Sequence, residues 1–190
     1  MHKLTSWVQA ITGVMLIIIF SMIPSSIISP QEDLSLSIIP LQSNWQIQGV
    51  LLTSLLCGPQ VGTISAISYL IIGLFYLPVF HGGGSVGYIL THEFGYLLGF
   101  IPAAWLCGLL AKKDTKANLI NYSFYTGMSL CVVHIIGIIY LIIGKVFGNW
   151  LENLSDLILI NTFIPFPTQL LLCIAISLLS IFLRRVLIIK

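Results

Sequence analysis

Residues 77–111 read LPVFHGGGSVGYILTHEFGYLLGFIPAAWLCGLLA, and the fold depends on this stretch. One apolar segment ends in Leu-Pro-Val-Phe at 77–80, three glycines follow at 82–84, and a second apolar segment runs to two lysines at 112–113. Because glycine has no side chain, backbone amides in such a turn can come close to a bound molecule. The pattern predicts a small-molecule pocket at a loop between two apolar helices. A plain flexible turn is the alternative.

The composition places these apolar segments in a membrane. Of the 190 residues, 57% are hydrophobic and 7% are charged, whereas an average soluble domain has roughly 25% charged residues. A membrane-spanning helix needs about 20 apolar residues, so the chain has room for about six spans with short loops. The net charge of +2 is too small to suggest a nucleic-acid partner. We therefore expect one all-α membrane domain over residues 1–190.

Turn signals divide the apolar sequence into six predicted helices. The dipeptide Gly58-Pro59 splits one long apolar run, because Gly-Pro strongly favours a turn. Polar loops are expected at 29–45 and at 144–161. The predicted helices cover residues 7–28, 38–57, 60–78, 88–111, 122–143 and 165–186.

The basic residues predict the orientation of these helices. With the N-terminus in the cytoplasm, six helices place seven of the eight Lys and Arg residues on the cytoplasmic side and only Lys145 outside. The seven are Lys3, Lys112, Lys113, Lys116, Arg184, Arg185 and Lys190. This is the positive-inside pattern. It predicts that both termini are cytoplasmic and that the glycine loop and His92 lie on the outer face.

Several enzymatic signatures are absent from the sequence. There is no phosphate-binding G-x-x-x-x-G-K-[ST] loop and no H-E-x-x-H zinc site. Gly82, Gly84 and Gly87 match G-x-G-x-x-G, but that fingerprint has meaning only between a strand and a helix of a βαβ unit. We therefore expect no enzyme, no cofactor and no metal. An intramembrane enzyme using His92, Glu93 and His134 is a minor alternative, because a lone histidine such as His134 is more often a packed residue.

The central third of the chain resembles a known family. Residues 46–111 are similar to the BioY family, the biotin-binding membrane subunits (S components) of energy-coupling-factor transporters. The similarity rests on the order and spacing of seven short elements. They are Gln46, Cys57-Gly58-Pro59, Tyr69, the segment 73–80, the glycines 82–84, the segment 95–100, and Lys112-Lys113.

The resemblance implies a function and partners. It implies a cell-membrane subunit that captures biotin from outside, and a membrane coupling subunit with two ABC ATPases that supply energy for import. Ala10 and Gly13 form a small-residue patch on the first helix, where another helix can pack closely. We take this patch as a candidate coupling interface, with packing inside the bundle as the alternative use.

The sequence departs from the family pattern where the family carries a charged pair that helps to hold biotin. The expected Asp aligns with Pro167 or Gln169, and the expected Lys with Leu170 or Leu172. A biotin carboxylate would then need another donor, either the backbone amides of 82–85 or His92. Gln169 can hydrogen-bond the ureido ring, because an amide is both donor and acceptor.

These inferences define the candidate ligand-binding residues and the competing functions. The residues are Gln46, Phe80, Gly82, Gly83, Gly84, Ser85, His92, Tyr96 and Gln169. The expected function is biotin capture for ATP-driven import. The alternatives are an S component for another vitamin or biotin-like compound, and a membrane scaffold protein with no ligand.

Overall fold

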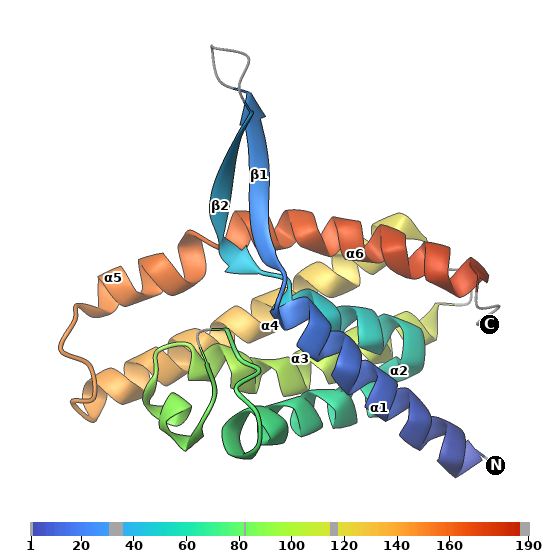
Figure 1. Cartoon of the computed structure of the whole chain (residues 1–190), viewed down its shortest axis with the longest axis horizontal. Coiled ribbons are helices and arrows are strands. Elements are labelled where there is room, and N and C mark those ends of the chain that lie inside the picture. The colour runs from blue at the N-terminus through green and yellow to red at the C-terminus, as the bar shows by residue number, and fades with distance from the viewer. Residues whose placement is uncertain (1, 31–35, 82, 115–117, 187–190) are drawn as a thin grey trace.

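The computed structural model describes residues 2–30, 36–81, 83–114 and 118–186 (Figure 1). Its long helices are α1 (His2–Ser21), α2 (Gln46–Phe75), α3 (Phe94–Lys113), α4 (Leu119–Val146) and α6 (Phe166–Val186). The shorter elements are the strands β1 (Pro24–Pro30) and β2 (Leu36–Asn44), the 3-10 helix η1 (Val86–Leu90), α5 (Leu154–Ile158) and the π-helical turn η2 (Leu159–Phe163).

Four helical stretches are long and apolar enough to cross a membrane, and Thr5–Ser21 is a shorter apolar helix. The four are Gln46–Phe75, Phe94–Lys113, Leu119–Val146 and Leu154–Val186. Large apolar side chains on these helices face outward, for example Ile135 on α4 and Phe182 on α6, which are 56% and 61% exposed. Such a surface suits lipid rather than water. The chain is a multi-pass membrane protein.

The helix α2 is a hairpin of two antiparallel halves, 46–57 and 59–75. Gly58 interrupts it with φ 83° and ψ 179°, and Pro59 follows inside the element. The Gln46 Nε2 atom donates to the Tyr69 hydroxyl at 2.8 Å, although 23 residues of straight helix would separate them by about 34 Å. The turn lies at the Gly58-Pro59 dipeptide where the sequence predicted it.

The helix α1 packs against both halves of α2. Ser65 donates to the Ala10 carbonyl at 3.1 Å, and a side chain at Gly13 would collide with Thr53 and Ser65. Ala10 is buried as well. In this structure the small-residue patch therefore serves packing inside the bundle, while Trp7 and Ile11 of α1 face outward.

The first two predicted helix boundaries were wrong. The first helix ends at Ser21 rather than at 28, and the second begins at Gln46 rather than at 38. Between them, β1 and β2 pair antiparallel, with Ile27 opposite Ile39, and the hairpin projects from the helices (Figure 1). The prolines at 24, 30 and 40 explain the error, because proline lacks the N–H that a helix interior requires. This hairpin is the departure from the all-α prediction within the described residues.

Two later segments also differ from the prediction. The segment 154–161 was expected in a loop but is helical, because α5 and η2 together cover residues 154–163. Its apolar residues Leu154, Leu157 and Ile158 recur at helical spacing, which favours a helix. The helix α3 begins at Phe94 rather than at 88, and the residues before it form the short helix η1.

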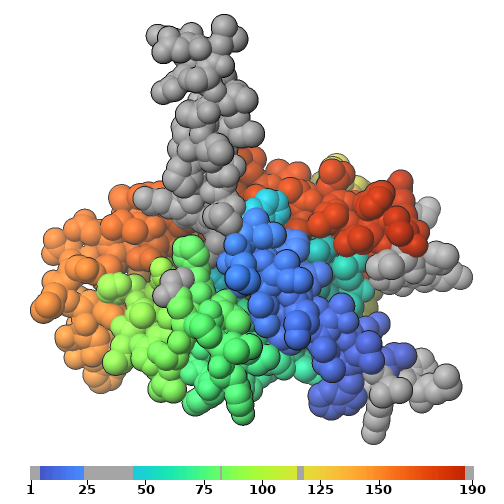
Figure 2. Space-filling view, in the orientation of Figure 1, coloured from blue at the N-terminus to red at the C-terminus, as the bar shows by residue number. Residues whose placement is uncertain are grey.

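The two ends of the bundle carry different features. The loop with η1 and the connection from α4 to α5 lie together at one end (Figure 2), where the Tyr140 hydroxyl donates to the Ile89 carbonyl. At the other end, α1 begins and α6 ends (Figure 1). This second end also carries Lys112 and Lys113 at the end of α3, and Arg184 and Arg185 at the end of α6. We call it the basic end.

Candidate ligand-binding site

An aromatic group holds the glycine loop against α2. The Tyr69 hydroxyl accepts from Gln46 and donates to the Val79 carbonyl at 2.9 Å. The buried Phe80 ring lies between Tyr69 and Tyr88, with centroid distances of 5.4 Å and 4.9 Å. Because Phe80 fills the space beside Gly73, a side chain at position 73 would collide with it. Gln46 and Phe80, two of the predicted ligand-binding residues, thus both contact Tyr69.

The glycines of the loop are needed for the turn itself. Gly83 has φ 131°, which side-chain-bearing residues rarely adopt, and its N–H donates to the Phe80 carbonyl at 3.0 Å. A side chain at Gly84 would meet the Gly73 carbonyl and the Pro78 backbone. Ser85 is exposed, and Gly82 lies outside the described residues. The Gly83 amide is therefore already engaged within the loop.

Tyr88 fixes the end of this loop. Its hydroxyl lies within hydrogen-bond distance of the His81 carbonyl, at 2.9 Å, and of the Glu93 carboxylate. Burial, together with the neighbouring Glu93 carboxylate, raises the pKa of Tyr88 far above its usual range. Tyr88 consequently remains protonated and links η1 to the start of α3.

His92 belongs to a different place from the other predicted residues. Its Nε2 atom lies 3.2 Å from the Glu152 carboxylate, and its ring lies 4.4 Å from the Trp150 ring. It lines an open cleft of about 570 Å³ on the α5 side of the bundle. The cleft is lined by His92, Leu151, Glu152, Asn153, Asp156, Leu157, Ile160 and Asn161. With Glu152 and Asp156 in its wall, this cleft does not suit a carboxylate ligand.

A second group of polar residues lies inside the bundle, where α2, α3, α4 and α6 meet. The His134 Nε2 atom is 2.9 Å from the Gln169 Oε1 atom, and Gln48 Nε2 donates to the Gln169 backbone carbonyl at 3.4 Å. Gln48 and His134 are only 0% and 4% exposed. Gln169 therefore connects an amide of α2 with an imidazole of α4.

Aromatic residues line this group. The Tyr96 and Phe166 rings lie 5.6 Å and 5.1 Å from the His134 ring, both edge to face. The Tyr96 hydroxyl is 2.7 Å from the Thr162 hydroxyl in η2. We refer to the whole set as the Gln169 cluster. Its members are Gln48, Tyr96, His134, Thr162, Phe166 and Gln169, none of which carries a fixed charge.

Two buried atoms of the Gln169 cluster, Gln48 Oε1 and His134 Nδ1, have no hydrogen-bond partner within the described ranges of the chain. Gln169 Oε1 can only accept, so it selects the tautomer in which His134 Nε2 carries the proton and Nδ1 is an acceptor. Leaving a buried polar atom unpaired costs about 1–3 kcal/mol. The cluster therefore presents two unfilled acceptors, and it suits a ligand with two N–H donors.

Only part of this cluster was predicted from the sequence. Gln169 and Tyr96 were candidate ligand-binding residues, whereas His134 was interpreted as a packed residue and Gln48 was not among the candidates. The available signal was an uncharged polar residue inside each of three apolar helices, because polar groups in membrane helices often mark a functional site. Gln46 and Gln48 share the first turn of α2, so this turn connects the aromatic group with the Gln169 cluster.

The fold is that of a membrane S component. The structure resembles the crystal structure of the S-component for biotin from an ECF-type ABC transporter, with a TM-score of 0.74 and 22% sequence identity. The match covers 97% of this chain and 93% of that chain.

The model of the BioY family matches residues 1–188, and the chain belongs to this family. Among curated relatives, a probable biotin transporter BioY from Lysinibacillus sphaericus is 30% identical, over 71% of this chain and 69% of the relative. The biotin transporter BioY from Thermotoga maritima is 29% identical, over 70% of this chain and 74% of the relative.

Proposed function

We propose that this protein is the substrate-binding membrane subunit of a vitamin uptake transporter and that its vitamin is biotin. The family membership and the names of the relatives support this function. The observation that carries the choice of ligand is the pair of unfilled acceptors, Gln48 Oε1 and His134 Nδ1. Biotin has a cyclic urea with two N–H donors, one for each acceptor.

The remaining polar groups of the Gln169 cluster suit the urea carbonyl. The Tyr96 hydroxyl can donate to it. The Gln169 side-chain NH2 group can donate as well, because His134 contacts only the Oε1 atom of this amide. The edges of Tyr96 and Phe166 offer apolar surface for the ring system of biotin. In this arrangement Gln169 positions both Gln48 and His134 and also contacts the ligand.

The carboxylate of biotin has no fixed cationic partner in this arrangement. The Gln169 cluster is uncharged, and His92, an earlier candidate donor, faces Glu152. The Gly83 amide, another candidate, donates to Phe80. Because an unpaired buried carboxylate is costly, the carboxylate of bound biotin points toward water at the loop end of the bundle. Recognition then depends on the urea head.

The proposed topology has six membrane crossings with both termini in the cytoplasm of a prokaryotic cell. Counting α2 as two halves gives six helical segments, and the grouping of Lys and Arg at the basic end supports this orientation. The energy for import comes from a membrane coupling subunit with two ABC ATPases. The exposed face of α1, with Trp7, Ile11 and Met15, offers the coupling subunit an apolar surface.

Thermal unfolding of the detergent-purified protein tests this function. Biotin at a hundredfold excess over its dissociation constant adds about 2.7 kcal/mol to the free energy of unfolding. Biotin methyl ester, which lacks the charge of the carboxylate, is expected to stabilise the protein nearly as well. Thiamine and riboflavin are expected to have no effect.

The variant His134→Phe locates the effect in the Gln169 cluster. It is expected to keep its own unfolding temperature but to lose the response to biotin, because phenylalanine fills the same space without the Nδ1 acceptor. If only another vitamin stabilised the protein, that vitamin rather than biotin would be the substrate. If the methyl ester did not bind, a cation would have to contact the carboxylate of biotin.

A further inference from the structure

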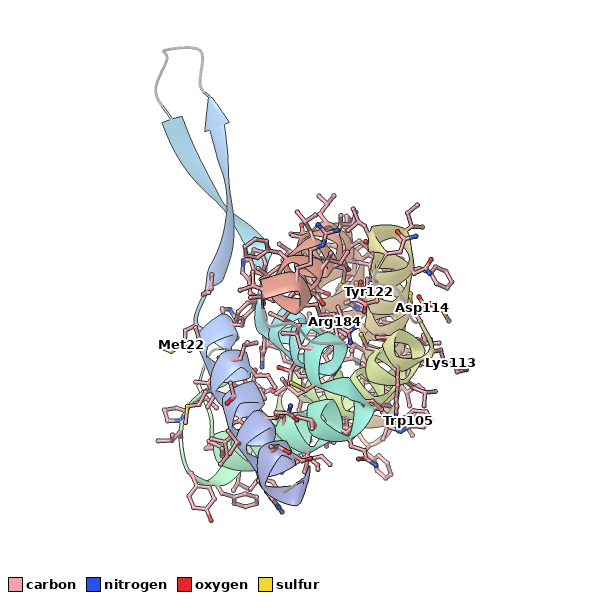
Figure 3. The ribbon with its side chains drawn as sticks, turned by 90° about the vertical axis from the view of Figure 1, so that its right-hand side faces the viewer. Met22, Trp105, Lys113, Asp114, Tyr122 and Arg184 are labelled. Carbon is pink, nitrogen blue, oxygen red and sulfur yellow. The ribbon has the colours of Figure 1, made fainter. Side chains whose placement is uncertain are left out.

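The side chain of Arg184 holds the turn of α2 at the basic end. Its Nη2 atom donates to the Leu55 carbonyl at 3.1 Å. In an uninterrupted helix that carbonyl would accept from the N–H four residues later, but residue 59 is proline and has no N–H. Arg184 thus replaces the missing backbone donor. Figure 3 shows Arg184 beside Tyr122, at the end of the bundle where α6 finishes.

Three buried donors at this place have no hydrogen-bond partner among the residues that the structure describes. They are the Arg184 Nε atom, the Tyr122 hydroxyl and the Ser180 hydroxyl. The guanidinium carbon lies 5.6 Å from the centroid of the Tyr122 ring, and Ser180 lies one turn before Arg184 on the same face of α6. Tyr122 and Ser180 are both completely buried. We call these three residues the Arg184 cluster.

The charge of Arg184 is not neutralised by the described part of the chain. The neighbouring carboxylate, Asp114, accepts instead from Asn121 Nδ2 and the Tyr125 hydroxyl, both at 2.8 Å. No salt bridge to Arg184 forms among the described residues. Lys112, Lys113 and Arg185 surround the same end of the bundle. The site therefore combines unfilled donors with positive charge, and no carboxylate of the described residues forms a salt bridge with Arg184.

We propose that the Arg184 cluster binds a phosphate oxyanion, supplied by the headgroup of an anionic phospholipid. Phosphate oxygens accept several charge-assisted hydrogen bonds, which matches a guanidinium flanked by two hydroxyls. Arg184 is only partly buried, so a headgroup reaches its exposed edge from the membrane surface. Basic pockets between helices at a membrane interface are suited to anionic headgroups. This inference is independent of the biotin site.

The surroundings of the cluster favour a lipid over free phosphate as the source of the oxyanion. Phe124 on α4 and Phe182 on α6 are 62% and 61% exposed. Each lies two residues from a member of the cluster, so it is at a similar depth on the outward face of its helix, where acyl chains attached to a bound headgroup would run. Free phosphate would gain nothing from this apolar surface.

Thermal unfolding of the full chain in mild detergent tests the proposal. Added phosphatidylglycerol is expected to raise the unfolding temperature by about 3 °C or more, whereas phosphatidylcholine, which has no net charge, is not. Sodium phosphate forms a third arm. An equal response to sodium phosphate would assign the site to free phosphate and overturn the lipid source, and equal responses to both lipids would overturn the site.

Three variants separate the Arg184 cluster from a general basic surface. Arg184→Gln and Tyr122→Phe are expected to lose most of the response to phosphatidylglycerol, while the exposed neighbour Arg185→Gln keeps it. Tyr122→Phe removes only an unpaired hydroxyl, so it decides the question if Arg184→Gln fails to fold. An equal loss in Arg185→Gln, or a full response in Tyr122→Phe, would contradict the proposal.

Discussion

Gln48 and His134 each make one hydrogen bond to Gln169 and leave one buried atom unpaired. A protein that only needed to pack these helices would be better served by apolar side chains, because an unpaired buried acceptor lowers stability. The two residues therefore reduce the stability of the ligand-free protein in a way that a bound ligand can reverse. The stability of the ligand-free protein and its affinity for the ligand should therefore change in opposite directions when one of these residues is replaced.

The variant Gln48→Met should bind biotin roughly 10-fold or more weakly while its ligand-free form is at least as stable as the parent. Methionine has a similar length and shape but no amide oxygen. Gln60→Met is the matched control, because Gln60 is exposed at the start of the second half of α2, just after the turn. Isothermal titration and thermal unfolding give the two quantities. A Gln48→Met protein that is clearly destabilised without ligand would mean that the amide oxygen is satisfied in the native protein.

For single residues, the sequence predicted which types of side chain form the site better than it predicted where each side chain lies in the fold. Gln169 and Tyr96 could be named because polar and aromatic groups are unusual in the segments that hold them. His92 was grouped with them, but it faces Glu152 and Trp150. The reason is that the direction of a side chain at a helix entry depends on how the preceding loop folds. His134 was undervalued because its partner lies 35 residues away in the sequence.

Among the elements, α2 determines the arrangement of the others. Its two halves lie antiparallel because Gly58 adopts a backbone conformation that is nearly restricted to glycine and because Pro59 cannot continue the hydrogen-bond pattern. Both halves contact α1, and a side chain at Gly108 of α3 would collide with the backbone of the turn. An error in this turn would therefore displace α1 and α3 together.

Two glycine substitutions should have opposite effects on stability. Gly58→Ala is expected to lower the free energy of unfolding by about 1–3 kcal/mol, because the positive φ is strained for alanine although no atom is near. Gly127→Ala, inside α4, is expected to raise it by about 1 kcal/mol, because alanine favours the helix and its methyl group would meet Leu170 at an ordinary 3.8 Å. Thermal unfolding of both variants measures the difference. Equal effects would show that backbone conformation does not control the turn.

The sequence predicted elements well where a local signal decides them. The Gly-Pro turn and the ends of α6 follow from apolar length and turn residues, whereas α4 is three residues longer at each end than predicted. The strands β1 and β2 were missed, because an apolar segment rich in isoleucine is compatible with either a helix or a strand until its partner is known. Three prolines in that region argued against helices, but the prediction gave more weight to the hydrophobic run.

For the whole molecule, the features at the two ends predict which end faces the cytoplasm. The basic end holds the beginning of α1 and the end of α6, whereas the loop end holds η1, the cleft beside His92 and the α4–α5 connection. Lys145 lies at the loop end, where its ammonium group donates to the carbonyls of Trp150 and Glu152. A structural use for Lys145 explains why one lysine departs from the positive-inside pattern.

Cysteine labelling in intact cells tests this orientation. In a chain whose four native cysteines are replaced by alanine, Ser85→Cys should react with a membrane-impermeant maleimide added outside. Lys113→Cys should react only after the membrane is made permeable. Both positions are exposed in the structure, so accessibility within the protein is matched. Labelling of only Lys113→Cys from outside would mean that the orientation is reversed. Labelling of both positions from outside would contradict the single membrane crossing by α3 that separates them.

The late position of α6 in the chain has a consequence for biosynthesis. The Leu55 carbonyl obtains its donor from a residue 129 positions later, and Gln48 is paired with a residue 121 positions later. While the ribosome is still making α3 and α4, the inserted first helices have neither partner. The nascent protein is therefore unable to bind a vitamin until its last helix has left the translocation machinery. A chain released before that stage has a Gly58-Pro59 turn without its Arg184 donor, which makes it a target for quality-control proteases.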